Sequence, residues 1–305
     1  MIVATGPVAP VAEELLGEIV VADERTLATL LPRAEVLIVR GGSTVSAATI
    51  EAAPNLRVIA RTGVGFDQVD VAAATRRGIP VVITPGAGAP AVAEAALALV
   101  VALAKRLPEL DRLVREGRWA ERDAYEVRDL EGMALGILGF GRIGRRLAVL
   151  AERLGMRVLA YDPYAEGAET DLPSLFAESD AVSLHAPLTE ETRGIVDAEL
   201  LAGAKPGLLL VNLARGAVVS SLDDLLAALE RGSLGGVGLD VFDPEPPDPA
   251  HPIFRHPRVL VSPHSLWRTP RALERTYREL SEGVLAVLRG DRPAAVANPE
   301  LYTSK

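Results

Sequence analysis

The chain has 305 residues, of which 49% are hydrophobic and 24% charged, which is enough for about two domains and excludes general disorder. It contains no cysteine, so disulfides, thiolate metal sites and a cysteine nucleophile are excluded. The net charge of −9 argues against nucleic acid as a main partner.

No targeting or membrane-spanning pattern is visible in the sequence. The longest apolar stretch, residues 89–104, is interrupted by Glu94 and is shorter than the roughly 20 residues that a membrane span needs. We therefore expect no membrane segment and a cytoplasmic location.

Short Val- and Ile-rich runs alternate with helical patterns over the first 90 residues. We expect strands at Ile2–Ala4, Glu18–Val21, Val36–Val39, Val58–Ala60 and Val81–Ile83. Helical patterns lie between them at Val11–Leu16, Thr26–Leu31, Ser46–Ala52 and Val69–Arg76. This alternation is typical of a parallel sheet built from βαβ units.

The alternation restarts after a long helical stretch, 91–117, which Pro108 is expected to interrupt. Six further strands are predicted, at Ala134–Leu138, Arg157–Tyr161, Ala181–His185, Leu208–Asn212, Gly236–Val241 and Val259–Ser262. A last helix, Arg271–Arg289, follows the sixth of these strands, and we expect it to pack back on the first domain. The prediction is an α/β protein with a discontinuous domain, 1–90 and 271–305, and a dinucleotide-binding domain, 91–270.

A glycine-rich turn follows the first strand of the second domain. Its G-x-G-x-x-G residues are Gly139, Gly141 and Gly144, with a helical pattern behind them and Asp162 at the end of the next strand. Such a turn brings backbone N–H groups and a helix N-terminus to a pyrophosphate, and Arg142 inside it suits the same group. Asp162 would accept hydrogen bonds from ribose hydroxyls and repel a 2′-phosphate, which predicts NAD rather than NADP.

Three polar residues follow later strands of the same domain. Arg215 comes after Leu208–Asn212, Glu245 lies in a proline-rich loop, and His264 follows Val259–Ser262. Because ligands of open parallel sheets bind beyond the carboxyl ends of the strands, these side chains are expected to converge. An arginine binds a carboxylate bidentately, and a histidine paired with a carboxylate exchanges a proton near neutral pH. That combination suits hydride transfer to a 2-keto acid. Taken singly, an arginine such as Arg215 is more often a surface or capping residue, and a glutamate such as Glu245 is more often a solvated loop residue.

Several motifs in order give the chain its resemblance to a known family. They are Arg61–Asp70 (RTGVGFDQVD), Arg76–Val81 with Thr84–Gly86, Ala91–Glu94, Gly139–Gly144, His185–Thr189, Ala214–Gly216 and Leu239–Pro246. Together they resemble the D-isomer-specific 2-hydroxyacid dehydrogenases, the family of phosphoglycerate dehydrogenases and of glyoxylate and hydroxypyruvate reductases.

The resemblance implies two flavodoxin- or Rossmann-like domains with a cleft between them, usually a homodimer formed through the cofactor domain. It implies that Arg215, Glu245 and His264 are catalytic, with His264 as general acid/base. Because no two histidines lie at ligand spacing on one helix, we expect no metal site. The implied cofactor-binding residues are Gly139, Gly141, Arg142, Ile143, Gly144, Asp162, Ala186, Pro187, Leu213 and Asp240. The implied substrate-binding residues are Arg40, Val64, Gly65, Arg215 and His264.

Departures from the family pattern reduce the range of substrates that we expect. Thr44 stands where phosphoglycerate enzymes often have Lys, which weakens the case for a phosphorylated substrate, and Glu245 argues against the formate dehydrogenase branch. A small 2-hydroxy or 2-keto acid is the expected substrate. One alternative is an NAD-sensing corepressor of the same fold, because such proteins keep the three catalytic residues. Another is an enzyme that acts on a different acid, such as phosphite.

Overall fold

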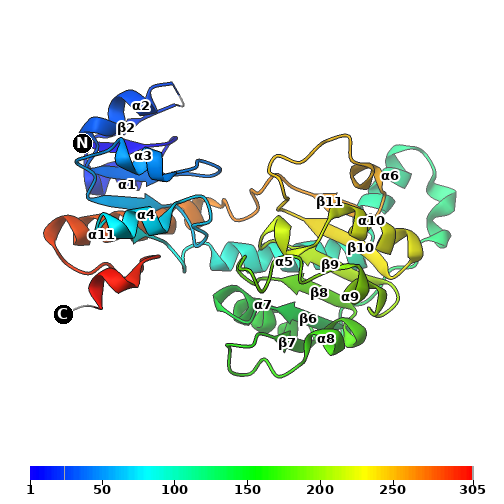
Figure 1. Cartoon of the computed structure of the whole chain (residues 1–305). Coiled ribbons are helices and arrows are strands. Elements are labelled where there is room, and N and C mark those ends of the chain that lie inside the picture. The colour runs from blue at the N-terminus through cyan, green and yellow to red at the C-terminus, as the bar shows by residue number, and fades with distance from the viewer. Residues whose placement is uncertain (24, 304–305) are drawn as a thin grey trace. The chain divides into compact units, whose positions relative to one another are not determined.

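The computed structural model describes residues 1–23 and 25–303, which form two compact units. Unit 1 consists of residues 1–88 and 268–305, and unit 2 of residues 89–267. These bounds lie within three residues of the predicted ones. Each unit is a parallel sheet with helices on both faces, as Figure 1 shows for each in turn.

Unit 1 has a five-stranded parallel sheet in the order β2-β1-β3-β4-β5. Its strands are β1 (Ile2–Ala4), β2 (Ile19–Val21), β3 (Val36–Val39), β4 (Val58–Arg61) and β5 (Val81–Val82). Its helices are α1 (Pro10–Leu16), α2 (Leu27–Leu30), η1 (Leu31–Arg33), α3 (Ala47–Glu51), α4 (Val71–Arg76), α11 (Pro270–Arg289) and η5 (Pro299–Tyr302). Buried side chains of α1 and α11 form the core on one face, and those of η1, α3 and α4 form the core on the other. The C-terminal helix therefore packs on the first domain, as predicted.

Unit 2 has a six-stranded parallel sheet in the order β11-β10-β9-β8-β6-β7. Its strands are β6 (Ala134–Leu138), β7 (Arg157–Tyr161), β8 (Ala181–Leu184), β9 (Leu208–Asn212), β10 (Leu234–Leu239) and β11 (Val259–Val261). Its helices are α5 (Ala89–Ala104), α6 (Leu107–Arg115), η2 (Trp119–Ala124), α7 (Arg142–Arg153), α8 (Leu172–Glu178), α9 (Ala198–Ala202), η3 (Gly216–Val218), α10 (Leu222–Arg231) and η4 (Pro252–Arg255). Helices α5 and α7 cover one face, and α8, α9 and α10 cover the other. Because all strands are parallel, the loops that follow them emerge at one edge of the sheet.

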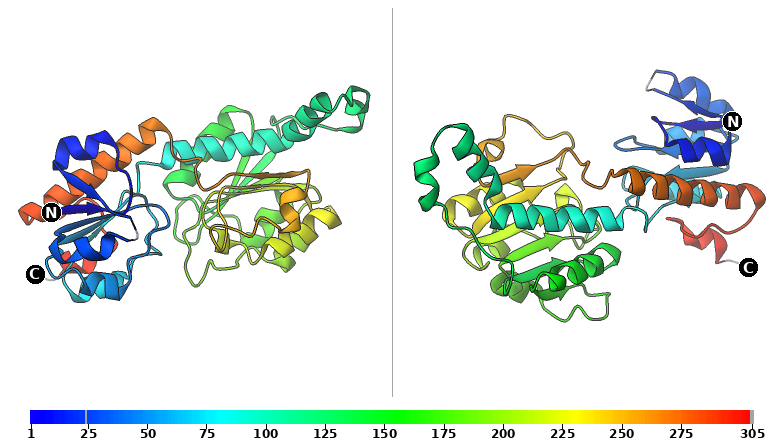
Figure 2. Two further views of the ribbon diagram at one scale, coloured as in Figure 1. Left: turned by 90° about the horizontal axis from the view of Figure 1, so that it is seen from above. Right: turned by 180° about the vertical axis from the view of Figure 1, so that it is seen from behind.

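The long helix that opens unit 2 is interrupted two residues before the predicted position. Arg106 has a left-handed backbone with φ of 49° and separates α5 from α6, while Pro108 lies inside the first turn of α6. Proline suits that turn because the first N–H groups of a helix have no partner within it. Glu109 receives two hydrogen bonds from the Arg106 guanidinium and so stabilises the bend. In Figure 2, α6 and η2 protrude beyond the sheet of unit 2.

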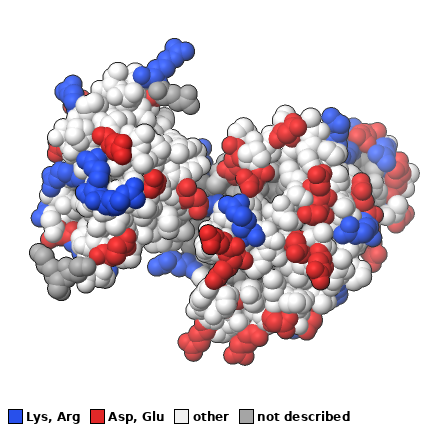
Figure 3. Space-filling view, viewed as in Figure 1, with Lys and Arg blue, Asp and Glu red and all other residues white. Residues whose placement is uncertain are grey.

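Charge is distributed unevenly between the units. Acidic and basic residues balance in the sequence of unit 1, so the net charge of −9 falls on unit 2. Figure 3 shows acidic side chains spread over the visible face of unit 2. An anionic ligand of unit 2 would therefore depend on nearby cationic side chains and backbone N–H groups. Across residues 1–23 and 25–303, no helix combines the length and hydropathy that a membrane span requires.

Candidate active site

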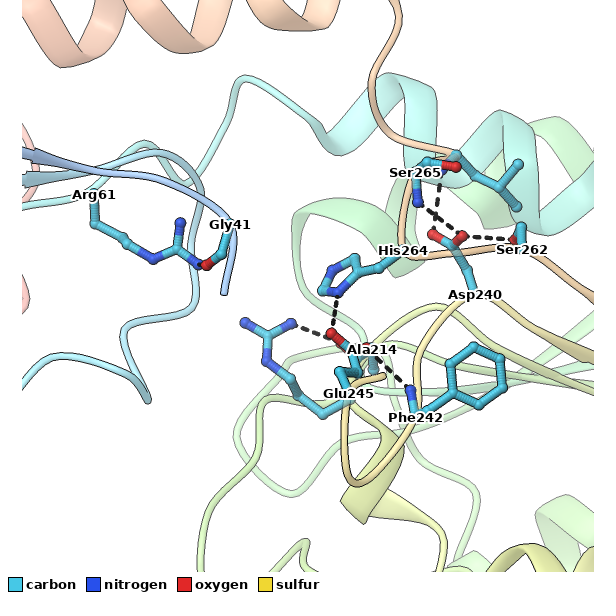
Figure 4. A network of polar contacts seen from close by, with 11 residues as sticks. Gly41, Arg61, Ala214, Asp240, Phe242, Glu245, Ser262, His264 and Ser265 are labelled. Carbon is cyan, nitrogen blue, oxygen red and sulfur yellow. Dashed lines mark hydrogen bonds and ion pairs between the residues drawn. The ribbon is translucent and has the colours of Figure 1, made fainter. Parts of the chain in front are cut away.

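A histidine–carboxylate pair lies beyond the carboxyl ends of β10 and β11. His264 Nδ1 is 2.9 Å from Glu245 Oε2, and Glu245 Oε1 accepts a hydrogen bond of 3.0 Å from Phe242 N. His264 has φ of 50°, a left-handed conformation that is uncommon outside glycine and that turns the chain between β11 and α11. Figure 4 shows the imidazole pointing toward the Glu245 carboxylate. The structure thus brings together two residues that are 19 positions apart.

The environment keeps the Glu245 carboxyl ionised. Partial burial raises its pKa, but hydrogen bonds from His264 and Phe242 N, together with the charges of His264 and Arg215, outweigh burial and lower it below the usual value of 4.5. An ionised carboxylate only accepts hydrogen bonds, so His264 Nδ1 carries the proton in this pair. The other ring nitrogen, Nε2, is therefore the one left to exchange a proton with a ligand.

Asp240 holds the loop that carries His264. Its side chain, only 3% exposed, accepts hydrogen bonds from Ser262 Oγ (2.6 Å) and Ser265 N (3.0 Å) through Oδ1, and from Leu266 N (3.3 Å) through Oδ2. These contacts flank His264 on both sides, as Figure 4 shows. The sequence predicted only a cofactor contact for Asp240; the structure adds this second role.

Arg215 follows β9 in the same loop cluster. Its Nη1 donates a hydrogen bond of 2.7 Å to Ala214 O, and its positive charge is one of the influences that lower the pKa of Glu245. Gly216 allows the close approach of this loop to the next one, since a Cβ at Gly216 would lie 2.0 Å from the carbonyl carbon of Phe242. The loops that bear Arg215 and Glu245 are therefore pressed against each other.

The glycine-rich turn between β6 and α7 has the geometry of a dinucleotide cradle. Gly139 has φ of 95°, and a Cβ there would meet Ala186 N at 2.5 Å. A Cβ at Gly144 would lie 2.3 Å from Gly139 O, so only glycine lets the helix begin this close to the strand. Around Gly141, the N-cap of α7, a Cβ would meet nothing within 4 Å, which leaves open space beside the helix N-terminus. These features fit a pyrophosphate.

Asp162 lies at the end of β7 beside this turn. Its Oδ2 accepts a hydrogen bond of 2.8 Å from Phe140 N, and its Oδ1 accepts one of 3.0 Å from Tyr164 N. Each oxygen keeps a lone pair for a further donor, so the carboxylate fits a ribose diol. The Arg145 guanidinium stacks on the Phe140 ring at 4.7 Å, while Arg142 lies exposed in the first turn of α7.

The other predicted cofactor residues lie in unit 2 as well. Ile143 packs against the core from the first turn of α7, Ala186 and Leu213 are buried behind the ends of β8 and β9, and Pro187 is exposed. His185 shares a hydrogen bond of 2.8 Å between its Nε2 and Ser183 Oγ. Its buried Nδ1 has no hydrogen-bond partner among the described residues. Burial lowers the pKa of His185 to about 4, so this imidazole is neutral at neutral pH.

The predicted substrate residues of unit 1 lie in loops at one edge of its sheet. Val64 is 48% exposed and, with Gly65, follows β4 in a loop held by two hydrogen bonds, from Gly63 N to Thr84 Oγ1 (2.8 Å) and from Thr84 N to Gly63 O (2.9 Å). The Arg61 guanidinium, drawn in Figure 4, donates to Gly41 O at 2.9 Å and so ties the loop after β3 to β4. Arg40 donates from Nη1 to Pro7 O, so its guanidinium is anchored to the loop after β1.

Sequence patterns did not reveal some residues that shape this site. Asn212, Gly216 and Phe242 hold the loops of Arg215 and Glu245. Gly216 and Phe242 lie inside the family motifs and Asn212 ends a predicted strand, but the sequence assigned none of them a role. Among residues 1–23 and 25–303, no group of three His, Asp or Glu side chains lies close enough to hold a metal ion.

Comparison with known sequences and structures agrees with this geometry. The family described as "D-isomer specific 2-hydroxyacid dehydrogenase, NAD binding domain" matches residues 97–265. The chain is 40% identical over 284 residues to a hydroxypyruvate reductase of Thermotoga maritima, covering 90% of this chain and 91% of the relative. It is 37% identical over 268 residues to a D-3-phosphoglycerate dehydrogenase of Archaeoglobus fulgidus, covering 85% of this chain but only 50% of that relative.

A solved structure shows the same architecture. A D-lactate dehydrogenase from Aquifex aeolicus, complexed with NAD and lactic acid, has 29% identity and a TM-score of 0.85, and the match covers 95% of this chain and 96% of the other. The likeness extends through both units, and that relative holds the cofactor which the glycine-rich turn fits.

Proposed function

The chain belongs to the D-isomer specific 2-hydroxyacid dehydrogenases, a family of NAD-dependent oxidoreductases, and from this premise we propose that it interconverts a short 2-keto acid and its D-2-hydroxy acid. The observation that carries the proposal is the 2.9 Å contact of His264 with Glu245 in the loop cluster that also bears Arg215. An acid/base pair and a fixed cation are the groups that reduction of a 2-keto acid requires.

An unphosphorylated substrate such as hydroxypyruvate or glyoxylate is favoured. The match to the hydroxypyruvate reductase covers nine-tenths of both chains. Thr44, in the loop after β3, supplies no charge for a phosphate. These two observations support the smaller substrate.

The residues of unit 2 divide the chemistry between them. The turn from Gly139 to Gly144 and the Asp162 carboxylate would hold NAD, which when bound supplies or accepts the hydride at the C2 carbon of the substrate. In the reductive direction His264 gives the proton from Nε2 to the keto oxygen, because its Nδ1 is engaged by Glu245. Glu245 stabilises the imidazolium before transfer and keeps the ring oriented afterwards.

Arg215 binds the substrate carboxylate and polarises the keto group. A guanidinium stays charged at any working pH and makes two parallel hydrogen bonds to a carboxylate. The backbone N–H groups of Val64 and Gly65 are the second set of donors proposed for that carboxylate, and Arg40 is proposed to contact the distal end of the substrate.

Consumption of NADH tests the proposal directly. The purified chain is offered glyoxylate, hydroxypyruvate, pyruvate, phenylpyruvate, 2-ketoglutarate and 3-phosphohydroxypyruvate, and turnover is expected with the small unphosphorylated acids. His264→Gln should abolish nearly all turnover while NADH still binds, and Arg215→Leu should do the same. Turnover at the wild-type rate by either variant would contradict the assignment. NADH binding without turnover of any acid would favour the NAD-sensing alternative.

A homodimer is the expected assembly. Leu107, Val114, Trp119 and Val127, in or beside α6 and η2, are each between 44% and 62% exposed. Large apolar side chains gathered on a protruding segment are typical of an interface. Light scattering should give twice the chain mass, and Trp119→Asp should give the mass of a single chain. Because turnover needs the NAD pool inside the cell, we also expect a cytoplasmic location, which fractionation of cells can test.

A further inference from the structure

Asn212, the last residue of β9, is a buried polar side chain to which the proposed mechanism gives no part. It is 1% exposed, and both ends of its amide are used locally. Nδ2 donates a hydrogen bond of 2.9 Å to Arg215 O, and Oδ1 accepts one of 3.0 Å from Ala214 N. The side chain thus spans the turn that carries Arg215.

These bonds form a closed ring with the guanidinium. Arg215 Nη1 donates to Ala214 O at 2.7 Å, so the charged head is attached to the residue whose N–H is held by Asn212. The carbonyl of Arg215 is held by the same amide. Asn212 therefore fixes both the backbone of Arg215 and the residue against which its guanidinium rests. Hydrogen bonds that join buried Asn212 and Ala214 to half-buried Arg215 permit few alternative arrangements of this turn.

This loop is pressed against Phe242 on one side and borders a cavity on another. A cavity of about 90 Å³ adjoins the loop and is lined by Asn212, Gly216, Ser220, Phe242 and Asp243, among others. Side chains that border a cavity lack neighbours on one side and are free to shift toward it. Without the Asn212 amide, the turn would have open space into which to relax.

We propose that Asn212 is a positioning residue that fixes Arg215 for the carboxylate of the substrate. The inference rests on the proposed function, because it takes Arg215 as the carboxylate-binding group. Reaction geometry tolerates displacements of only about half an ångström, so a loosened turn should weaken substrate binding although the guanidinium is still present. The hydrogen bonds of the Asn212 amide join it to Ala214 and Arg215, and not to the His264–Glu245 pair.

Binding of oxalate, a small analogue of a 2-keto acid, measures without turnover how well Arg215 is placed to bind a carboxylate. In the presence of NADH, Asn212→Ala should weaken oxalate binding about 10-fold or more, since one buried and one half-buried hydrogen bond of the turn are lost. With a substrate found in the screen, KM should rise by a similar factor, while NADH affinity and the pH profile of kcat stay unchanged. Asn212→Asp keeps the acceptor for Ala214 N but sets a carboxylate oxygen against Arg215 O, so it too should bind oxalate more weakly than the wild type.

A double variant shows whether Asn212 acts through Arg215. If it does, Asn212→Ala with Arg215→Leu should bind oxalate no more weakly than Arg215→Leu alone. Asn298→Ala is the matched control, because Asn298 is equally buried in unit 1 and bonds Val81 N, Thr75 Oγ1 and Ile79 O. It should lower the melting temperature without changing KM.

The outcomes separate the inference from the proposed function. Oxalate binding by Asn212→Ala at wild-type affinity, or additive effects in the double variant, would overturn the positioning role while leaving the dehydrogenase intact. A wild-type chain that neither binds oxalate nor oxidises NADH with any 2-keto acid would overturn the proposed function itself.

Discussion

His185 should make the stability of unit 2 depend on pH in a window set by its own titration. The imidazole shares Nε2 with Ser183 Oγ, and its buried Nδ1 has no partner among the described residues. Protonation would place a second N–H and a positive charge where neither has a partner. Burial therefore lowers the pKa of His185 from 6.5 to about 4 in the folded chain.

The sign and size of the effect follow from this difference. Between pH 6.5 and 4 the His185 imidazole binds a proton in the unfolded chain but stays neutral in the folded chain, so a lower pH favours unfolding. At pH 5 the cost of His185 alone is about 2 kcal/mol relative to pH 7.5, and at pH 4 it approaches about 3 kcal/mol. Below pH 4 both states bind the proton and the loss stops growing.

Urea unfolding of the wild type and of His185→Gln measures the pH-dependent contribution of His185 to the free energy of unfolding. Glutamine places an amide near the position of Nε2 and cannot be protonated. Both tryptophans, Trp119 and Trp267, lie in unit 2, so their fluorescence follows the unfolding of that unit. Between pH 7.5 and 5 the free energy of unfolding should fall by about 2 kcal/mol more in the wild type than in the variant. Equal losses in the two proteins would refute the reasoning, because all other titrating groups are shared.

Three further substitutions test other parts of the site. Glu245→Gln removes the carboxylate that stabilises protonated His264 and should lower reductive kcat at neutral pH about 100-fold; a kcat within twofold of wild type would contradict its role. Asp162→Ala should reduce the preference for NADH over NADPH, measured as the ratio of kcat/KM values, and an unchanged ratio would exclude Asp162 from ribose recognition. Gly216→Ala forces a Cβ to within 2.0 Å of the Phe242 carbonyl carbon, so it should lower both the melting temperature and kcat/KM. Gly232→Ala is its control, because a Cβ at that helix end meets nothing within 4 Å; it should lose stability alone.

Local sequence patterns were sufficient for most of the fold. The alternation of Val- and Ile-rich runs with helical patterns predicted the strands to within about two residues at each end, because burial on both faces of a parallel sheet requires such runs. The bend before α6 was misplaced because Pro108 was taken as the interruption. The interruption is instead the left-handed Arg106, which Glu109 stabilises.

The sequence by itself also determined the cofactor turn, because its parts lie within one strand, turn and helix. The close approach of Gly144 to Gly139 O is local to this turn, whereas that of Gly139 to Ala186 N joins it to the loop after β8. The order of the strands and the meeting of loops from different strands were decided by the tertiary structure. Asp240 bonds Ser262 and Ser265 because β10 and β11 are neighbours in the sheet, and Gly216 meets Phe242 because β9 and β10 are.

The same holds for the chemistry of the site. The proton on His264 Nδ1 follows from a contact with Glu245 that joins two loops. The hydrogen bonds of Asp240 lie on both sides of the left-handed His264 backbone. The role proposed for Asn212 depends on the hydrogen bond from its side-chain amide to Arg215 O, which only the folded turn forms. Residue types and their spacing record which groups are present, whereas hydrogen bonds between loops depend on where the sheet places the loop ends.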